Sequence, residues 1–148
     1  MKKSTITPEQ EKQIINKISE IESKTSAEIK IIIKNKKGFF EKRKSCYQIA
    51  VKEFYKNKLH LTKDRTGVLL LILLKEHEVT ILGDAGINSK IEPNFWDNVI
   101  NDIIPFFKEN NLAEGIIKAL EDISEPLITY FPIQENDQNE LSNDIIIK

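Results

Sequence analysis

Residues 67–82 read GVLLLILLKEHEVTIL, and this stretch decides the fold of the chain. Residues 67–74 form a continuous apolar run of strand length, which is typical of a strand buried on both faces of a sheet. A short polar segment, residues 75–78, separates this run from a second extended pattern at residues 79–82. We therefore predict two strands that form an antiparallel hairpin.

The sequence before the hairpin predicts a helix, a strand and a second helix. Residues 7–10 read TPEQ, which is typical of a capped helix start, and isoleucines recur at helical spacing up to residue 21. From residue 27 the apolar period changes to two, which predicts a strand. A basic amphipathic helix then runs to about residue 58. A strand, a crossover helix and a strand form one unit, so we expect the two strands to be parallel.

The sequence after the hairpin predicts two more helices, at residues 93–107 and 113–130, and Pro105 is expected to kink or break the first of them. We expect one domain over residues 1–133 and a polar, disordered tail over residues 134–148. Deleting everything after Ile133 should then leave the melting temperature nearly unchanged.

Composition excludes several classes of protein. Among the 148 residues there is a single cysteine, Cys46, which excludes an internal disulfide and lies on an apolar helix face, as a core residue would. The longest apolar run is far below the roughly 20 residues that a membrane helix needs. We expect a cytoplasmic protein with no membrane partner. Nucleic acid is an unfavoured partner, because the basic residues are mostly lysines without interleaved aromatic platforms.

The predicted topology gathers carboxylates at one end of the sheet. The starts of both parallel strands and the end of the hairpin lie there, and Glu28, Asp64 and Asp84 occupy these positions. Asp97 lies in the first turn of the following helix. A cluster of like charges is costly unless a cation or a proton relieves it. Carboxylate oxygens suit Ca²⁺, Mg²⁺ or Mn²⁺, so we predict a divalent-cation site, with Ca²⁺ as the foremost candidate.

Each carboxylate also has a purely structural interpretation. Asp84 can stabilise a turn, Asp97 can complement a helix dipole, and Asp64 can pair with Arg65 or Lys63. The shared site makes a different prediction: Asp84→Asn weakens cation binding and leaves the cation-free protein at least as stable, since it removes repulsion.

The opposite end of the sheet carries lysines. Lys34, Lys36 and Lys37 precede a helix N-terminus, where an anion can bind, although a solvated lysine loop is the alternative. We interpret His60 and His77 as surface residues. The chain has no G-x-S-x-G nucleophile motif.

Six ordered blocks together resemble the TPM domain family, over residues 7–132. The Phe-Trp-Asp block is similar to that of short bacterial members. The blocks are Ser26-Ala27-Glu28-Ile29, Thr66-Gly67-Val68-Leu69-Leu70-Leu71, Gly83-Asp84-Ala85-Gly86-Ile87, Phe95-Trp96-Asp97-Asn98-Val99, Pro105-Phe106-Phe107 and Ala113-Glu114-Gly115-Ile116.

The resemblance implies an α/β/α sandwich that binds calcium or a related divalent ion through acidic residues, and a relation to a plant thylakoid-lumen acid phosphatase. Glu28, Asp84 and Asp97 lie inside matching blocks, whereas Asp64 only precedes one. Two functions follow as hypotheses. The first is an accessory or interaction module with an unknown protein partner. The second is a metal-dependent acid phosphatase, for which Arg65 is the nearby cation.

Overall fold

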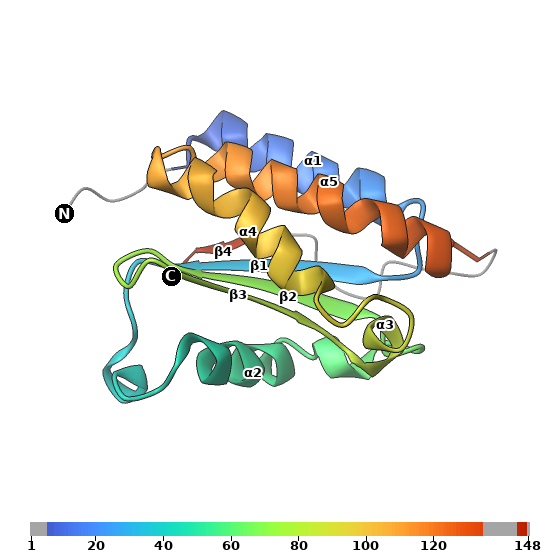
Figure 1. Ribbon diagram of the computed structural model, residues 1–148, viewed down its shortest axis with the longest axis horizontal. Coiled ribbons are helices and arrows are strands. Elements are labelled where there is room, and N and C mark those ends of the chain that lie inside the picture. Colours follow the sequence, from blue (N-terminus) through green and yellow to red (C-terminus); the bar gives the residue numbers. More distant parts are fainter. Residues whose placement is uncertain (1–5, 135–144, 148) are drawn as a thin grey trace.

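The computed structural model describes residues 6–134 and 145–147. Within this part of the chain a four-stranded mixed sheet lies between two helical layers (Figure 1). Helices α1, α4 and α5 cover one face of the sheet and α2 covers the other. The elements are α1 (Pro8–Glu22), β1 (Glu28–Lys34), η1 (Phe39–Glu41), α2 (Cys46–Lys56), η2 (Leu59–Leu61), β2 (Gly67–Leu73), β3 (Glu78–Gly83), α3 (Ala85–Asn88), α4 (Phe95–Lys108), α5 (Leu112–Tyr130) and β4 (Ile145–Ile147).

The sheet confirms the predicted crossover unit and hairpin. Its strand order is β3-β2-β1-β4. Strand β1 pairs with β2 in parallel, from Glu28 beside Gly67 to Lys34 beside Leu73, and β2 pairs with β3 antiparallel. Every residue of β1 and β2 is buried, whereas β3 is partly exposed at the sheet edge. This explains the unbroken apolar run of β2, because both of its faces contact other layers.

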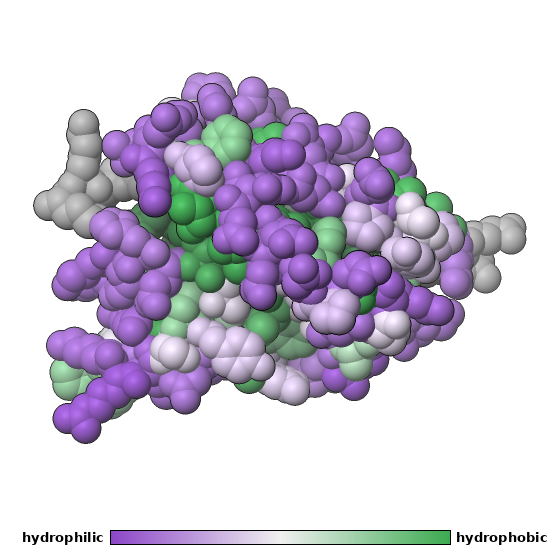
Figure 2. All heavy atoms as spheres, viewed as in Figure 1, coloured by the Kyte–Doolittle hydropathy of each residue, from purple (hydrophilic) through white to green (hydrophobic). Residues whose placement is uncertain are grey.

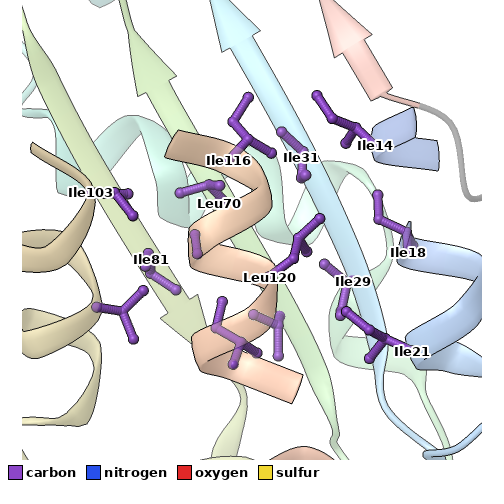
Figure 3. Close-up of a cluster of buried hydrophobic side chains, with 14 of the residues drawn as sticks. Ile14, Ile18, Ile21, Ile29, Ile31, Leu70, Ile81, Ile103, Ile116 and Leu120 are labelled. Atoms are coloured by element: carbon purple, nitrogen blue, oxygen red, sulfur yellow. The ribbon is translucent and has the colours of Figure 1, made fainter. Parts of the chain in front are cut away.

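The larger core lies between the sheet and the layer of α1, α4 and α5 (Figure 3). The period of two in β1 directs alternate isoleucines into it, and the helical period of α1 supplies a matching stripe. A complete capping box at Thr7 and Gln10 starts α1, as the sequence predicts. The isoleucines from these two elements are Ile14, Ile18, Ile21, Ile29, Ile31 and Ile33.

A smaller core lies between the sheet and α2. It contains Ile32 of β1, alternate leucines of β2, and Ile49 and Phe54 of α2. Cys46 belongs to it and is buried, as predicted, and burial raises the pKa of its thiol.

Helix α4 continues through Pro105 to Lys108, which excludes the predicted break at this proline and leaves the predicted kink as the alternative. Pro105 has no N–H to donate to the carbonyl of Asn101, four residues earlier. Because Pro105 is exposed and close to the helix end, that carbonyl can face water. The segment after β3 forms the short helix α3, for which we predicted no helix, and Asp84 caps it. No helix in the described ranges is long and apolar enough to cross a membrane.

The prediction of a disordered tail is wrong for residues 145–147. These residues form β4, which pairs in parallel with β1 between Ile31 and Ile33. Ile145 is 8% exposed and joins the larger core, whereas Ile147 is 49% exposed. Burial of these isoleucines offsets the entropy lost when three residues are ordered. The polar segment before them hid this apolar run when the tail was judged by its composition. Residues 135–144 lie outside the described residues.

We predict that Ile145→Ala lowers the free energy of unfolding by about 1–3 kcal/mol, since it removes buried apolar surface at the sheet edge. The melting temperature should fall by several degrees in a thermal denaturation followed by circular dichroism. Ile147→Ala is the matched control and should change stability by less than about 0.5 kcal/mol. Equal melting temperatures for both variants and the wild type would contradict the docking of β4.

Candidate functional site

The carboxylate rim, which we define as Glu28, Asp64, Asp84 and Asp97, lies at the end of the sheet where β1 and β2 begin and β3 ends. Glu28 is paired with Gly67 in the parallel ladder, and the N–H of Asp84 donates to the carbonyl of Gly67 at 2.9 Å. The topology therefore places Glu28 and Asp84 on opposite sides of Gly67, at the end of the sheet that the sequence predicts.

Asp84 is held in a two-pronged ion pair with Arg65. Arg65 Nε donates to Asp84 Oδ2 at 2.7 Å, and a terminal guanidinium nitrogen donates to Oδ1 at 2.8 Å. The N–H of Ala85 also donates to Oδ1, at 2.8 Å. The Asp84 side chain is only 7% exposed, whereas that of Arg65 is 50% exposed. Arg65 thus serves Asp84 and is not the partner of Asp64.

The surroundings of Asp84 keep it ionised. Burial alone would raise the pKa of this carboxyl, but hydrogen bonds from Arg65 and Ala85, together with the Arg65 charge, lower it overall. The same contacts raise the pKa of Arg65. The expectation that Asp84→Asn leaves the protein at least as stable is therefore wrong in its premise, because Asp84 faces a guanidinium and not a group of carboxylates.

The loop that carries Arg65 requires a glycine opposite it. Arg65 adopts a left-handed backbone conformation with φ 57°. Gly86 packs directly on the carbonyl oxygens of Asp64 and Arg65, and its N–H donates to the Arg65 carbonyl at 2.9 Å. A Cβ atom at residue 86 would overlap both carbonyl groups. The Gly-Asp-Ala-Gly block therefore fixes both the carboxylate and the backbone segment that supplies its counter-ion.

Glu28 and Asp84 do not share a site. The two residues lie on either side of Gly67, so their Cα atoms are about 10 Å apart, or two strand spacings. The space above Gly67 is filled by the carbonyl of Leu59, which starts η2 and would overlap a Cβ atom at residue 67. The backbone of η2 therefore lies between the strand positions of the two residues and separates their carboxylates.

The other two rim residues are exposed. Asp64 lies in the loop before β2, and Asp97 lies in the first turn of α4. Across residues 6–134 and 145–147, the structure contains no group of three or more His, Cys, Asp or Glu side chains that could hold a metal ion. The four predicted residues share one end of the fold but do not converge on one point.

Glu28 has a different carboxylate neighbour, Glu22, which ends α1. Oε2 of Glu22 accepts a hydrogen bond from the N–H of Ile29 at 2.7 Å. Burial raises the pKa of Glu22 to about 8, and the charge of Glu28 and a hydrogen bond with it act in the same direction. The relief of carboxylate repulsion that we expected at this rim therefore operates between Glu22 and Glu28, and a proton supplies it.

His60, which we interpreted as a surface residue, lies near Asp84 instead. The His60 ring packs against Tyr55 with centroids 4.7 Å apart, and the charge of His60 helps to lower the pKa of Asp84. His60 Nδ1 is buried and has no hydrogen-bond partner in the described part of the chain. The signal was available: His60 and Arg65 belong to the same short connection between α2 and β2.

One of the three lysines predicted to bind an anion, Lys34, is not accessible to a dissolved anion. Lys34 is buried, and its ammonium group pairs with Glu41 at 2.8 Å and with Glu53 at 3.0 Å. Burial would lower the pKa of Lys34, but these two carboxylates raise it overall. Lys36 is exposed, and the N–H of Lys37 donates to Glu76 at 3.3 Å. Only Lys36 and Lys37 remain available to a dissolved anion.

A hollow of about 470 Å³ lies at the other end of β2, between the β2–β3 turn and α4. Its wall is mainly apolar, with His77, Glu78 and Lys108 as its ionisable side chains. The hollow and the carboxylate rim occupy opposite ends of β2.

Comparisons with known proteins agree with this architecture. A family model described as TPM domain matches residues 2–125. The NMR structure of the BA42 protein from the psychrophilic bacterium Bizionia argentinensis is 31% identical, with a TM-score of 0.85, over 97% of this chain and 95% of that one. The N-terminal domain of a protein from P. gingivalis has the same fold at 17% identity, with a TM-score of 0.71 over 86% of this chain and 80% of that one. No curated protein matches.

The raised pKa of Glu22 predicts a stability that falls as pH rises. A carboxyl with a pKa of about 8 in the folded state and about 4.5 in the unfolded state binds more protons when folded. Stability conferred by this proton is complete below about pH 4.5 and is lost as pH approaches 8. We expect a loss of about 2 kcal/mol across this window, allowing for partial hydration.

Glu22→Gln keeps an acceptor for the Ile29 N–H and should flatten this pH profile in urea denaturation. Glu20→Gln is the matched control, because Glu20 forms an exposed pair with Lys17, and it should keep the wild-type slope. A wild-type profile that is flat or rises between pH 5 and 8 would contradict the protonated carboxyl pair.

Proposed function

We propose, from the premise that this chain belongs to the TPM domain family, that it binds a divalent cation at Asp84 and works as an accessory or interaction module. Calcium is the first candidate. One observation carries the proposal: Asp84 is a buried, ionised carboxylate whose counter-ion, Arg65, is half exposed. A cation that reaches Asp84 from solvent can take the place of the guanidinium.

The residues around Asp84 fit a hard cation in type. Ca²⁺ accepts carboxylate oxygens, backbone carbonyls and water in flexible geometry. Asp84 would hold the ion, and the exposed carboxylate of Asp64 is the second candidate ligand, since its own backbone packs on Gly86 beside Asp84. Glu28 is separated from this position by η2, and Asp97 is exposed on α4, so neither belongs to the proposed ligand set.

Exchange of cations gives the module a way to signal. In the cation-free state Arg65 is tied to Asp84, and its loop is held against α3 through Gly86. A bound cation would free the Arg65 guanidinium, which is a planar donor suited to carboxylate and phosphate groups. The free guanidinium and the surrounding loop then become the surface that a protein partner can recognise.

Removing Arg65, which competes with a metal cation for Asp84, should strengthen binding of that cation. Arg65→Gln should lower the stability of the cation-free protein only modestly, because the Arg65 side chain is half exposed. The same variant should be stabilised by Ca²⁺ at lower concentrations than the wild type. A ligand that binds only the folded state adds about 2.7 kcal/mol at a hundredfold excess over its Kd, which thermal denaturation in Ca²⁺ and in chelator will detect.

Asp84→Asn should lose the response to Ca²⁺ and should lower stability by about 1 kcal/mol, since it removes the ion pair with Arg65 while the amide oxygen can still cap α3. Asp97→Asn is the matched control, and we expect wild-type stability and a wild-type response. The proposal is falsified if neither the wild type nor Arg65→Gln responds to Ca²⁺, Mg²⁺ or Mn²⁺.

A second function, an acid phosphatase, is favoured by the position of His60. Arg65 pairs with Asp84, and the charge of His60 acts on the same carboxylate, so a guanidinium donor and an imidazole belong to one end of the sheet. A free Arg65 would bind two phosphoryl oxygens while a water molecule attacks phosphorus. His60 would donate a proton to the ester oxygen as its bond to phosphorus breaks, and the proton of the water would leave with the phosphate product. The cation, when bound, would supply charge that polarises the phosphoryl group.

If the protein is an accessory module, it should show no cation-dependent hydrolysis of an aryl phosphate. The wild type with added Ca²⁺ or Mg²⁺ should then release the phenol no faster than Asp84→Asn. A rate that requires the cation, disappears in Asp84→Asn and falls at least tenfold in His60→Gln would instead favour the phosphatase. His77→Gln is the matched control, because His77 lies in the β2–β3 turn at the other end of the sheet.

A further inference from the structure

The loop between β1 and α2 presents an aromatic tip to solvent. The tip, which we define as Phe39 and Phe40, forms most of η1, and its side chains are 76% and 85% exposed. The two rings lie edge to face, with centroids 5.1 Å apart. Single exposed apolar side chains are common on protein surfaces, but two adjacent exposed phenylalanines at the end of one loop form a patch.

Cationic side chains surround the aromatic tip. In Figure 1 this loop projects from the lower left of the molecule, and Figure 2 shows the same corner as hydrophilic apart from a small hydrophobic patch. Lys42 Nζ lies 5.4 Å from the centre of the Phe39 ring. One acidic side chain, Glu76, contacts the loop backbone at Lys37. The cations of the loop, with one of them partly buried, are Lys36, Lys37, Lys42, Arg43 and Lys44.

A buried ion-pair network holds the tip outward. Glu41, the one acidic residue within this loop, is 5% exposed, and it accepts hydrogen bonds from the Gly38 N–H at 2.9 Å and from the Lys34 ammonium at 2.8 Å. Lys34 also pairs with Glu53 of α2 at 3.0 Å. Lys52 Nζ lies 3.9 Å from Glu41, so two ammonium groups balance the two carboxylates and the surface of the loop remains cationic.

We propose that this loop docks on an anionic lipid bilayer, with Phe39 and Phe40 inserted between the headgroups and the cations in contact with lipid phosphates. Aromatic side chains on a cationic surface suit the interface of a membrane, and this mode needs no spanning helix. We expected no membrane partner because no segment is long and apolar enough to span a bilayer, but docking on the bilayer surface requires no such segment.

The arrangement suits a bilayer better than a nucleic acid. Proteins that bind single strands present aromatic faces to successive bases along a cationic groove. Here the two rings contact each other edge to face at a protruding tip, and Lys42 lies over one ring face. A second copy of this chain is also a poor partner, because the cations around the two tips would repel each other.

The test uses the full chain and sedimentation with lipid vesicles. We expect binding to vesicles of equal parts phosphatidylcholine and phosphatidylglycerol, no binding to phosphatidylcholine alone, and loss of binding as NaCl is raised. Phe39→Ser combined with Phe40→Ser should weaken binding at least tenfold at an unchanged melting temperature. Arg43→Gln combined with Lys44→Gln should weaken it about fivefold for each charge. Tyr130→Ser, another exposed aromatic residue, is the matched control.

Insertion has its own readout. Tryptophan emission of Phe40→Trp should shift to shorter wavelength on the anionic vesicles and should be quenched by brominated lipid, beyond any change of the native Trp96. Failure to bind the anionic vesicles, or equal binding by the double phenylalanine variant, would overturn the proposal. So would loop-dependent binding to oligouridine, or to an acidic polypeptide, in the absence of vesicle binding.

Discussion

The parallel pairing of β1 with β2 is the constraint on which the rest of the molecule depends. It aligns Glu28 with Gly67 at one end and Lys34 with Leu73 at the other. The first end then receives the antiparallel return of β3, which delivers Asp84 beside Gly67. The second end releases the chain into the loop of η1. Because both strands are buried on both faces, neither can slip by one residue without moving charged residues into the opposite core. The register therefore fixes the positions of the carboxylate rim and of the aromatic tip together.

Buried charge is compensated in three different ways in this small fold. Lys34 is paired with two glutamates, Asp84 is paired with Arg65, and the Glu22 carboxyl, beside Glu28, has a raised affinity for a proton. The first arrangement is closed to solvent and holds the loop and α2 against β1. The second leaves Arg65 half exposed, and we propose on this ground that another cation can replace it. The third depends on pH. The degree of exposure of the compensating group therefore separates a structural ion pair from a pair that another ligand can enter.

The sequence predicted most of the fold because period and topology are local signals. The buried run of β2, the alternation in β1 and the capping box of α1 each depend on neighbouring residues, and all three were confirmed. Strand β4 was not predicted because its three isoleucines follow a polar segment and become a strand only through pairing with β1. The site was harder to predict. Topology correctly placed Glu28 and Asp84 at one end, but it could not show that the Leu59 carbonyl fills the space over Gly67 between them. The ion pair between Arg65 and Asp84 likewise depends on the left-handed backbone conformation of Arg65. This conformation cannot be inferred from the identity of the side chain.

The two proposed activities occupy opposite ends of β1, and this separation has a mechanical consequence. Strand β1 has seven residues, so its ends are about 20 Å apart at the usual rise per residue. A bilayer that receives the aromatic tip would leave the carboxylate rim in water, well beyond a Debye length of about 8 Å at physiological salt. Cations concentrated at an anionic surface would therefore not compete directly with Arg65 for Asp84, and the rim would respond to the cations of the bulk solution. The fold would then hold a cation-responsive surface at a set height above the membrane, with β1 as the rigid spacer between the two.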